Sequence, residues 1–163
     1  MPFTTHAQVR FAHVDPAGIV FYPRYFEMLN GAVEDWFADH LGTDFKTLHL
    51  DHHLGIPTVK LDVRFIAPSE LGDRLTITIK PRAVGRSSCT LEIVFSGGER
   101  DRLRAIVVLV CMDLGSQRAT AWPREIAERI RHELEAPDAG DDHDPGAAKP
   151  DSCGPGDGRR STS

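Results

Sequence analysis

Asp15 and Tyr22 are the residues whose types and spacing best fit a catalytic function in this sequence. Asp15 stands in a Pro/Gly turn seven residues ahead of Tyr22, and Pro23 follows at what reads as the first position of a helix. Proline suits that position because its missing N–H would find no partner in a first helical turn. The free N–H groups at a helix start carry partial positive charge and can hold a developing anion. The stretch therefore offers a base or nucleophile and an oxyanion site, the two requirements of acyl transfer.

A capping Asp15 and a packing Tyr22 would explain the same spacing without catalysis, because Asp-Pro is an ordinary turn signal and proline an ordinary helix opener. Residues 15–25, DPAGIVFYPRY, nevertheless resemble the signature of the hotdog-fold acyl-CoA thioesterases of the 4-hydroxybenzoyl-CoA thioesterase type. An eleven-residue match of this kind is specific. The resemblance extends more loosely over roughly residues 6–130, through segments at 55–58, 68–73 and 85–88.

The resemblance implies hydrolysis of an acyl-CoA thioester, with an aromatic or short-chain acyl group, to a free acid and CoA. Asp15 would either attack the carbonyl carbon to give an acyl-enzyme anhydride or activate a water molecule, and both roles stay open. Tyr22 would contribute its backbone N–H, which polarises the carbonyl and stabilises the oxyanion. One such donor is typically worth about 2.7–4 kcal/mol of activation free energy. The reaction so described uses no cofactor and no metal ion.

The turn that contains Arg86, Ser87 and Ser88 is the candidate site for the phosphates of CoA. Phosphates are bound by arginine, hydroxyl and backbone N–H groups, and the equivalent turn of the resembling family lies in its CoA site. The hydroxybenzoyl enzymes have a more basic run here, whereas this chain has one arginine followed by two serines. Arg64 and Arg82 are therefore additional candidates, and a solvated hairpin tip is the alternative interpretation.

The histidines are not assigned to the reaction. His13 stands where an acidic residue is expected in the closest hydroxybenzoyl-type relatives, but a histidine in a turn is more often polar surface. This departure argues against a 4-hydroxybenzoyl substrate rather than against the thioesterase class. His49, His52 and His53 resemble metal ligands only by crowding, since no second motif completes a site and a polar loop or short helix explains them equally well.

Hydrophobic periodicity predicts the elements that must position these residues. A strand at 4–12 precedes a helix from residue 23 to about residue 40, whose wide apolar stripe suits a helix embraced by a sheet. Alternation at 59–65 predicts a strand with one buried face, and the apolar run at 103–112 predicts a central strand covered on both faces. The other expected elements are strands at 75–80, 89–95 and 119–122 and a closing helix at 123–135.

This order predicts an α+β domain at 1–135, with one long central helix wrapped by a five- or six-stranded antiparallel sheet. The hotdog name comes from the resemblance, as does the expectation of a homo-oligomer. In that family two domains pair into one continuous sheet with active sites at the subunit interface, often in a tetramer of two dimers. An unpaired strand edge would make such pairing reasonable, although the sequence does not show which edge it is.

Length and composition limit the domain number and the class of protein. The 163 residues suit one domain, and a net charge of −5 argues weakly against a nucleic-acid binder. No stretch resembles a leader or a membrane span, so a soluble cytoplasmic protein is expected. Residues 136–163 contain no Val, Ile, Leu or aromatic side chain and are expected to form a disordered tail. Cys89, Cys111 and Cys153 show no C-x-x-C pair, and the first two read as small core residues.

Two functions from other classes remain as alternatives. A hotdog acyl-CoA dehydratase or hydratase would need a His-centred acid–base pair, and the helix-start motif contains no histidine. A non-catalytic module would bind an acyl group without turnover, and the carboxylate of Asp15 argues mildly against it. The acyl group itself does not follow from the sequence.

Overall fold

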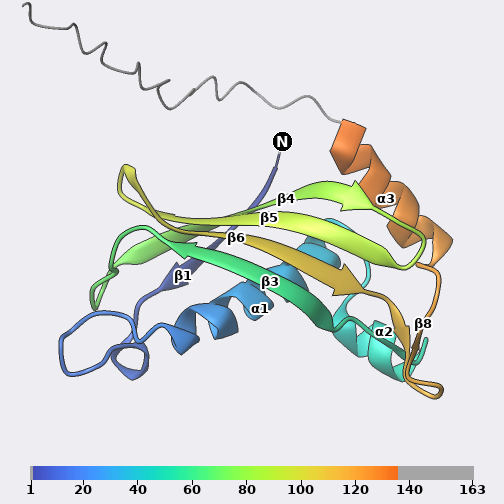
Figure 1. Cartoon of the computed structure of the whole chain (residues 1–163), viewed down its shortest axis with the longest axis horizontal. Helices are drawn as coiled ribbons and strands as arrows, with labels where there is room; N and C mark the ends of the chain where they lie inside the picture. The colour runs from blue at the N-terminus through green and yellow to red at the C-terminus, as the bar shows by residue number, and fades with distance from the viewer. Residues whose placement is uncertain (1, 136–163) are drawn as a thin grey trace, which may run out of the picture.

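A five-stranded antiparallel sheet curves around one long helix in the computed structural model, which describes residues 2–135 (Figure 1). The strand order is β1-β4-β5-β6-β3, so that β1 and β3 form the two edges. The strands are β1 (Phe3–Gln8), β3 (Thr58–Phe65), β4 (Arg74–Val84), β5 (Ser88–Gly97) and β6 (Arg100–Val110). The expected α+β fold with a wrapped central helix is confirmed. The tail expected at 136–163 lies outside the described residues.

The central helix α1 (Pro23–Asp39) begins and ends close to its predicted limits. Its buried residues recur at helical spacing and face the buried residues of β4, β5 and β6, which makes one continuous core. Burial of each large apolar side chain contributes roughly 1.5–3 kcal/mol relative to exposure. The buried residues of α1 are Tyr25, Leu29, Ala32, Val33, Trp36 and Phe37.

Smaller elements close the far end of the sheet. A second, three-stranded sheet among the described residues contains β2 (Leu54–Gly55), β7 (Met112–Asp113) and β8 (Arg118–Ala119). The histidine-rich segment begins as helix α2 (Phe45–Leu50), and within residues 2–135 no group of three or more His, Cys, Asp or Glu residues is arranged to hold a metal ion. Helix α3 (Arg124–Glu135) closes the described part of the chain. None of the helices within residues 2–135 has the length and apolar character needed to cross a bilayer.

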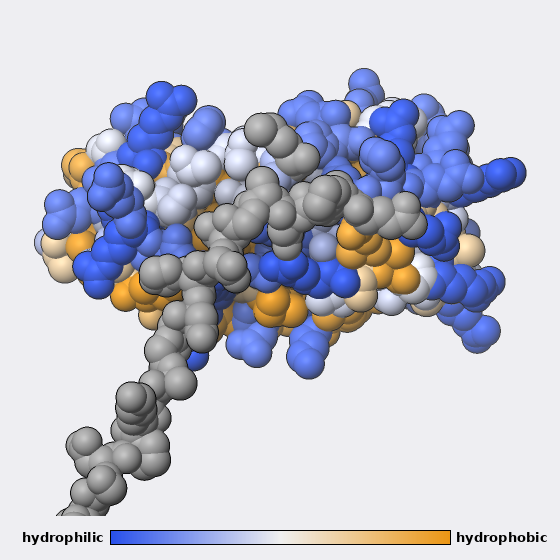
Figure 2. All heavy atoms as spheres, turned by 90° about the horizontal axis from the view of Figure 1, so that it is seen from above, coloured by the Kyte–Doolittle hydropathy of each residue, from blue (hydrophilic) through white to orange (hydrophobic). Residues whose placement is uncertain are grey.

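The strand expected at 119–122 is the shorter β8, which ends at Ala119, and three further details differ from the predicted elements. The first strand ends at Gln8 instead of residue 12, because Val9 leaves the sheet and exchanges hydrogen bonds with Gly72 and Asp73. β6 is covered on one face only, since Ile106 on the outer face is 40% exposed. The prediction that one face of β3 is buried is wrong for the protomer. Leu61 on that face is 42% exposed, because β3 is an edge strand. In the view from above, apolar side chains show along the lower margin, on the β3 side of the sheet (Figure 2).

Cys89 and Cys111 lie in the core, as predicted. Burial raises the pKa of the Cys89 thiol to about 12 and that of Cys111 to about 11. Both side chains therefore remain protonated at neutral pH, and neither is a candidate nucleophile. Cys153 lies outside the described residues.

Candidate active site

Asp15 lies in a tight loop at residues 9–20, called the Asp15 loop, whose own backbone fixes the carboxylate. The Asp15 N–H donates to the carbonyl of Ile19 at 3.0 Å, and the N–H of Gly18 donates to the Asp15 carbonyl at 2.9 Å. Gly18 has a φ of +79°, a backbone conformation that residues other than glycine rarely adopt. Asp15 Oδ1 accepts the N–H of Ala17 at 2.9 Å, while Oδ2 accepts no hydrogen bond from residues 2–135. One carboxylate oxygen orients the side chain and the other is available for chemistry.

Tyr22 is the residue immediately before α1, and its backbone already has helical torsions. Pro23 at the first helical position has no N–H, and the N–H of Arg24 donates to Phe21. Within residues 2–135 the N–H of Tyr22 donates to no acceptor. An unpaired N–H at a helix start is the kind of group that can stabilise an oxyanion.

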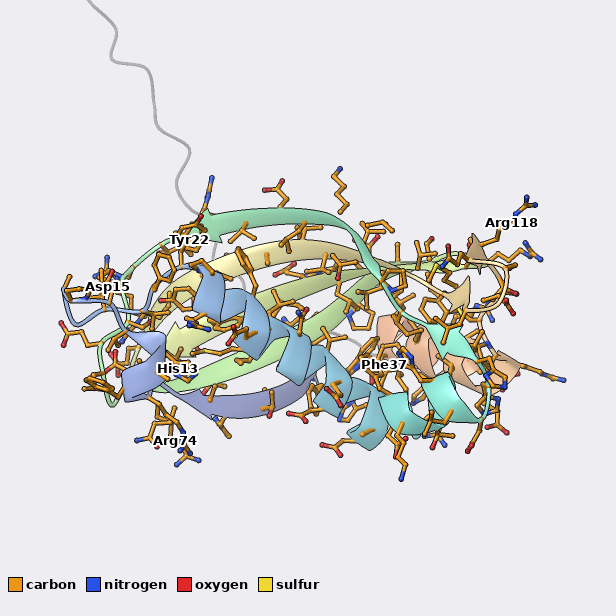
Figure 3. The ribbon with its side chains drawn as sticks, turned by 90° about the horizontal axis from the view of Figure 1, so that it is seen from below. His13, Asp15, Tyr22, Phe37, Arg74 and Arg118 are labelled. Atoms are coloured by element: carbon orange, nitrogen blue, oxygen red, sulfur yellow. The ribbon has the colours of Figure 1, made fainter. Side chains whose placement is uncertain are left out.

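Figure 3 shows Asp15 and Tyr22 at the same end of the molecule, where α1 begins, with Arg118 at the opposite end. His13 lies in the same loop, and its Nδ1 accepts the N–H of Arg10 at 2.9 Å. Its carbonyl accepts the N–H of Phe21 at 2.9 Å. His13 thus supports the shape of the loop through its ring nitrogen and its backbone.

An aromatic patch, made of Phe21, Tyr22, Phe26 and Phe65, surrounds the helix start. The Tyr22 ring makes edge contacts with Phe26 and Phe65, with centroid separations of 6.5 and 6.2 Å. Tyr22 and Phe65 are 58% and 52% exposed, so the patch is open to a ligand or a partner. The sequence does not indicate this patch, because Phe65 reads as one more inward residue of a strand and its contact with Tyr22 is tertiary.

The turn between β4 and β5 carries the predicted phosphate-binding residues. Its backbone is tied to the chain beyond β6: the N–H of Cys111 donates to the Ser87 carbonyl at 2.8 Å, and the N–H of Trp122 donates to the Arg86 carbonyl at 2.9 Å. The exposed Arg86 side chain has no hydrogen-bond or ion-pair partner in the described part of the chain. Arg82 is engaged on the outer face of the sheet, where its Nε donates to Glu92 at 2.8 Å.

Arg86 and Asp15 lie at opposite ends of the protomer. Strand β4 starts at the turn that contacts the Asp15 loop and ends at the turn that contains Arg86. An eleven-residue strand spans about 35 Å, at roughly 3.3 Å per residue. One protomer therefore brings Asp15 and Tyr22 together but does not bring them to Arg86, Ser87 and Ser88.

A long central helix wrapped by a curved antiparallel sheet is the architecture of the hotdog class of folds. Residues 9–130 match the thioesterase-like superfamily, and the chain belongs to that family. The family predicted from residues 15–25 is confirmed.

Known relatives agree with this membership, and a solved structure agrees with the fold. The chain is 33% identical over 94 residues to 1,4-dihydroxy-2-naphthoyl-CoA hydrolase of Thermosynechococcus vestitus. The matched region covers 56% of this chain and 64% of that relative. It is 27% identical over 128 residues to the long-chain acyl-CoA thioesterase FadM of Escherichia coli, covering 77% of this chain and 95% of that relative. The structure of a 1,4-dihydroxy-2-naphthoyl-CoA thioesterase from Synechocystis superposes with a TM-score of 0.75 at 24% identity, covering 84% of this chain and all of that one. The relatives are acyl-CoA thioester hydrolases, as predicted.

Proposed function

We propose that this protein hydrolyses the thioester of an aromatic acyl-CoA, with Asp15 as the catalytic carboxylate and the Tyr22 N–H as the oxyanion donor. The observation that carries the proposal is the unpaired N–H at the start of α1, next to a carboxylate loop, in a chain of the thioesterase-like superfamily. Membership of the family supports the reaction class, and the loop geometry supports the assignment of the two residues.

In the proposed reaction the thioester carbonyl oxygen accepts the Tyr22 N–H, which stabilises the negative charge that develops on that oxygen. Asp15 Oδ2 then acts in one of two ways. As a nucleophile it bonds to the carbonyl carbon and expels the CoA thiolate, and water hydrolyses the resulting anhydride to the acid and free Asp15. As a general base it takes a proton from water while the water oxygen attacks the carbonyl carbon, and CoA leaves as the thiol.

The aromatic patch supports an aromatic acyl group. Aromatic rings prefer edge and offset contacts with one another, worth about 0.5–1.5 kcal/mol beyond their buried area. Tyr22 and Phe65 present such rings beside the oxyanion donor. The similarity to 1,4-dihydroxy-2-naphthoyl-CoA hydrolase points the same way, while the similarity to FadM makes a long aliphatic chain the alternative.

A panel of benzoyl-, naphthoyl-, hexanoyl- and palmitoyl-CoA, followed by release of the free thiol, tests the reaction and the acyl class together. We expect the highest kcat/KM on an aryl substrate. Phe65→Leu should lower the aryl-to-aliphatic ratio of kcat/KM by about fivefold, since a ring contact of about 1 kcal/mol is lost. Ile106→Leu, on the outer face, should leave that ratio unchanged. An unchanged ratio in Phe65→Leu would exclude Phe65 from the acyl site, and absence of thiol release from every substrate would exclude the thioesterase function.

We also propose that two protomers pair through β3 and complete the site. Support comes from the free edge of β3 and from its exposed apolar side chains, with Val59 60% exposed and Leu61 42% exposed. A monomer rarely leaves such an edge uncovered. A twofold axis through paired antiparallel β3 strands would bring the β4–β5 turn of one protomer to the Asp15 end of the other.

Arg86→Ala tests the assignment of the phosphates. We expect KM for acyl-CoA to rise about tenfold, equivalent to about 1.4 kcal/mol, with kcat nearly unchanged, because a remote contact stabilises ground and transition states equally. The rise should shrink at high salt. The matched control is an acyl-pantetheine substrate, which carries no CoA phosphates and should show no effect. Equal losses on both substrates would mean that Arg86 supports the fold or the acyl pocket instead.

A further inference from the structure

Ser69 is the one polar residue that is fully buried in the described part of the chain, with an exposed fraction of 0%. It lies in the turn at residues 66–73, between β3 and β4, which we call the platform turn. The Tyr25 hydroxyl donates to Ser69 Oγ at 2.9 Å. The Ser69 carbonyl accepts the N–H of Val20 at 2.8 Å. One residue is therefore bonded to the first turn of α1 through its side chain and to the Asp15 loop through its backbone.

The platform turn is bonded to the Asp15 loop along the whole length of the loop. Residues at both ends of the loop and in its middle bond to the turn through their backbones. These contacts are Val9 N–H to Asp73 O at 2.8 Å, Gly72 N–H to Val9 O at 2.9 Å, Leu71 N–H to Gly18 O at 3.3 Å, and a bridge between Ile19 and Glu70. The position of Asp15 therefore follows the position of the platform turn.

The platform turn is in turn anchored to the sheet by Arg102 on β6. Arg102 Nη1 donates to the Pro68 carbonyl at 2.8 Å and to Asp73 Oδ2 at 2.9 Å, and its side chain is only 16% exposed. The pKa of the Asp73 carboxyl is lowered from its ordinary value, first by the N–H of Glu70 and then by Arg102. Arg102 thus ties the turn to the sheet, whereas Tyr22 stands at the start of α1.

The Tyr25–Ser69 hydrogen bond joins the platform turn to α1, within one helical turn of Tyr22. The Tyr25 ring is already held by Phe65 and Phe95, with centroid separations of 6.2 and 5.8 Å, so a phenylalanine would pack there equally well. A buried hydroxyl without a partner is costly, which makes the pair sensitive to any shift of the helix against the turn.

We propose that Tyr25 and Ser69 are positioning residues, whose buried hydrogen bond sets the Asp15 carboxylate against the Tyr22 N–H. The inference rests on the proposed hydrolysis. Displacement of a reacting group by about 1 Å can lower the rate about 100-fold. Loss of the Tyr25–Ser69 hydrogen bond should therefore lower kcat about tenfold. The proposed acyl and CoA contacts are assigned to other residues, so substrate binding should change little.

The test compares Tyr25→Phe, Ser69→Ala and the double variant by kcat, KM and Tm. Each single variant should lower kcat about tenfold with KM within about twofold, and should also lower Tm, because one buried partner is left unpaired. The double variant removes both polar groups, so its Tm should recover while its kcat stays low. Glu133→Ala is the control at the other end of α1: it removes the acceptor of Trp36 Nε1, at 3.1 Å, and the partner of His40 Nδ1, at 2.8 Å. It should lower Tm without lowering kcat.

Recovery of kcat together with Tm in the double variant would overturn the positioning role, as would an equal loss of kcat in Glu133→Ala. Full kcat in both single variants of an active enzyme would overturn it while leaving the proposed function intact. A wild-type protein that releases no thiol from any acyl-CoA would refute the proposed function, and the positioning role would fall with it.

Discussion

Asp15→Asn is expected to lower kcat for thioester hydrolysis by at least about 10³-fold while the fold and CoA binding are retained. The amide has the shape of the carboxylate, and its oxygen can still accept the N–H of Ala17 that now bonds to Oδ1. It can neither form an acyl-enzyme nor take a proton from water at neutral pH. Thiol release measures the loss, and calorimetric titration with CoA and thermal unfolding check that binding and stability persist.

Glu27→Gln is the matched control for Asp15→Asn. Glu27 is another carboxylate near the start of α1, where it is exposed and paired with Arg24 at 2.8 Å. Removing its charge should leave kcat within about twofold of wild type, because a surface pair of this kind contributes little. If Asp15→Asn kept about a tenth of the wild-type kcat, a positioned base or nucleophile could not be assigned to Asp15.

The second large effect is expected from Leu61→Asp on the free edge of β3. A carboxylate at this position would have to be buried against β3 of the second protomer. The twofold axis would also place the two introduced carboxylates close together. We expect the protein to sediment as a monomer. Its kcat/KM should fall at least about 100-fold, since the Asp15 end would lose the phosphate-binding turn and the closed acyl site that the partner supplies.

Ile106→Asp is the control for Leu61→Asp, because Ile106 is exposed to nearly the same extent but lies on the outer face of the sheet. It should leave a dimer with normal kcat/KM. If the wild type is a tetramer and this variant a dimer, the outer face joins the two dimers. A monomeric Leu61→Asp protein with full activity would show that one protomer holds a complete site, and the cross-subunit assignment of Arg86 would have to be withdrawn.

The sequence alone determined the features that depend on local pattern. Helix α1 follows from the 3.6-residue period and from Pro23, and strands β4 and β5 follow from alternation between turns. The family followed from the run between Asp15 and Tyr25, because a short loop and a helix start contain both the proposed catalytic groups and their spacing. Each of these features is formed within a few turns or residues of the chain.

Only the tertiary structure decided how these pieces meet. β3 and β6 read as strands with buried faces, but burial depends on what covers a face, and in the protomer no neighbouring strand covers the outer edge of β3. No local pattern distinguishes Ser69, whose two hydrogen bonds join it to residues more than forty positions away in the sequence. Arg86 lay in a plausible phosphate-binding turn, yet its distance from Asp15 is set by the length and direction of β4. Contacts between distant segments leave no periodic or local signal, because they depend on the packing of the whole chain.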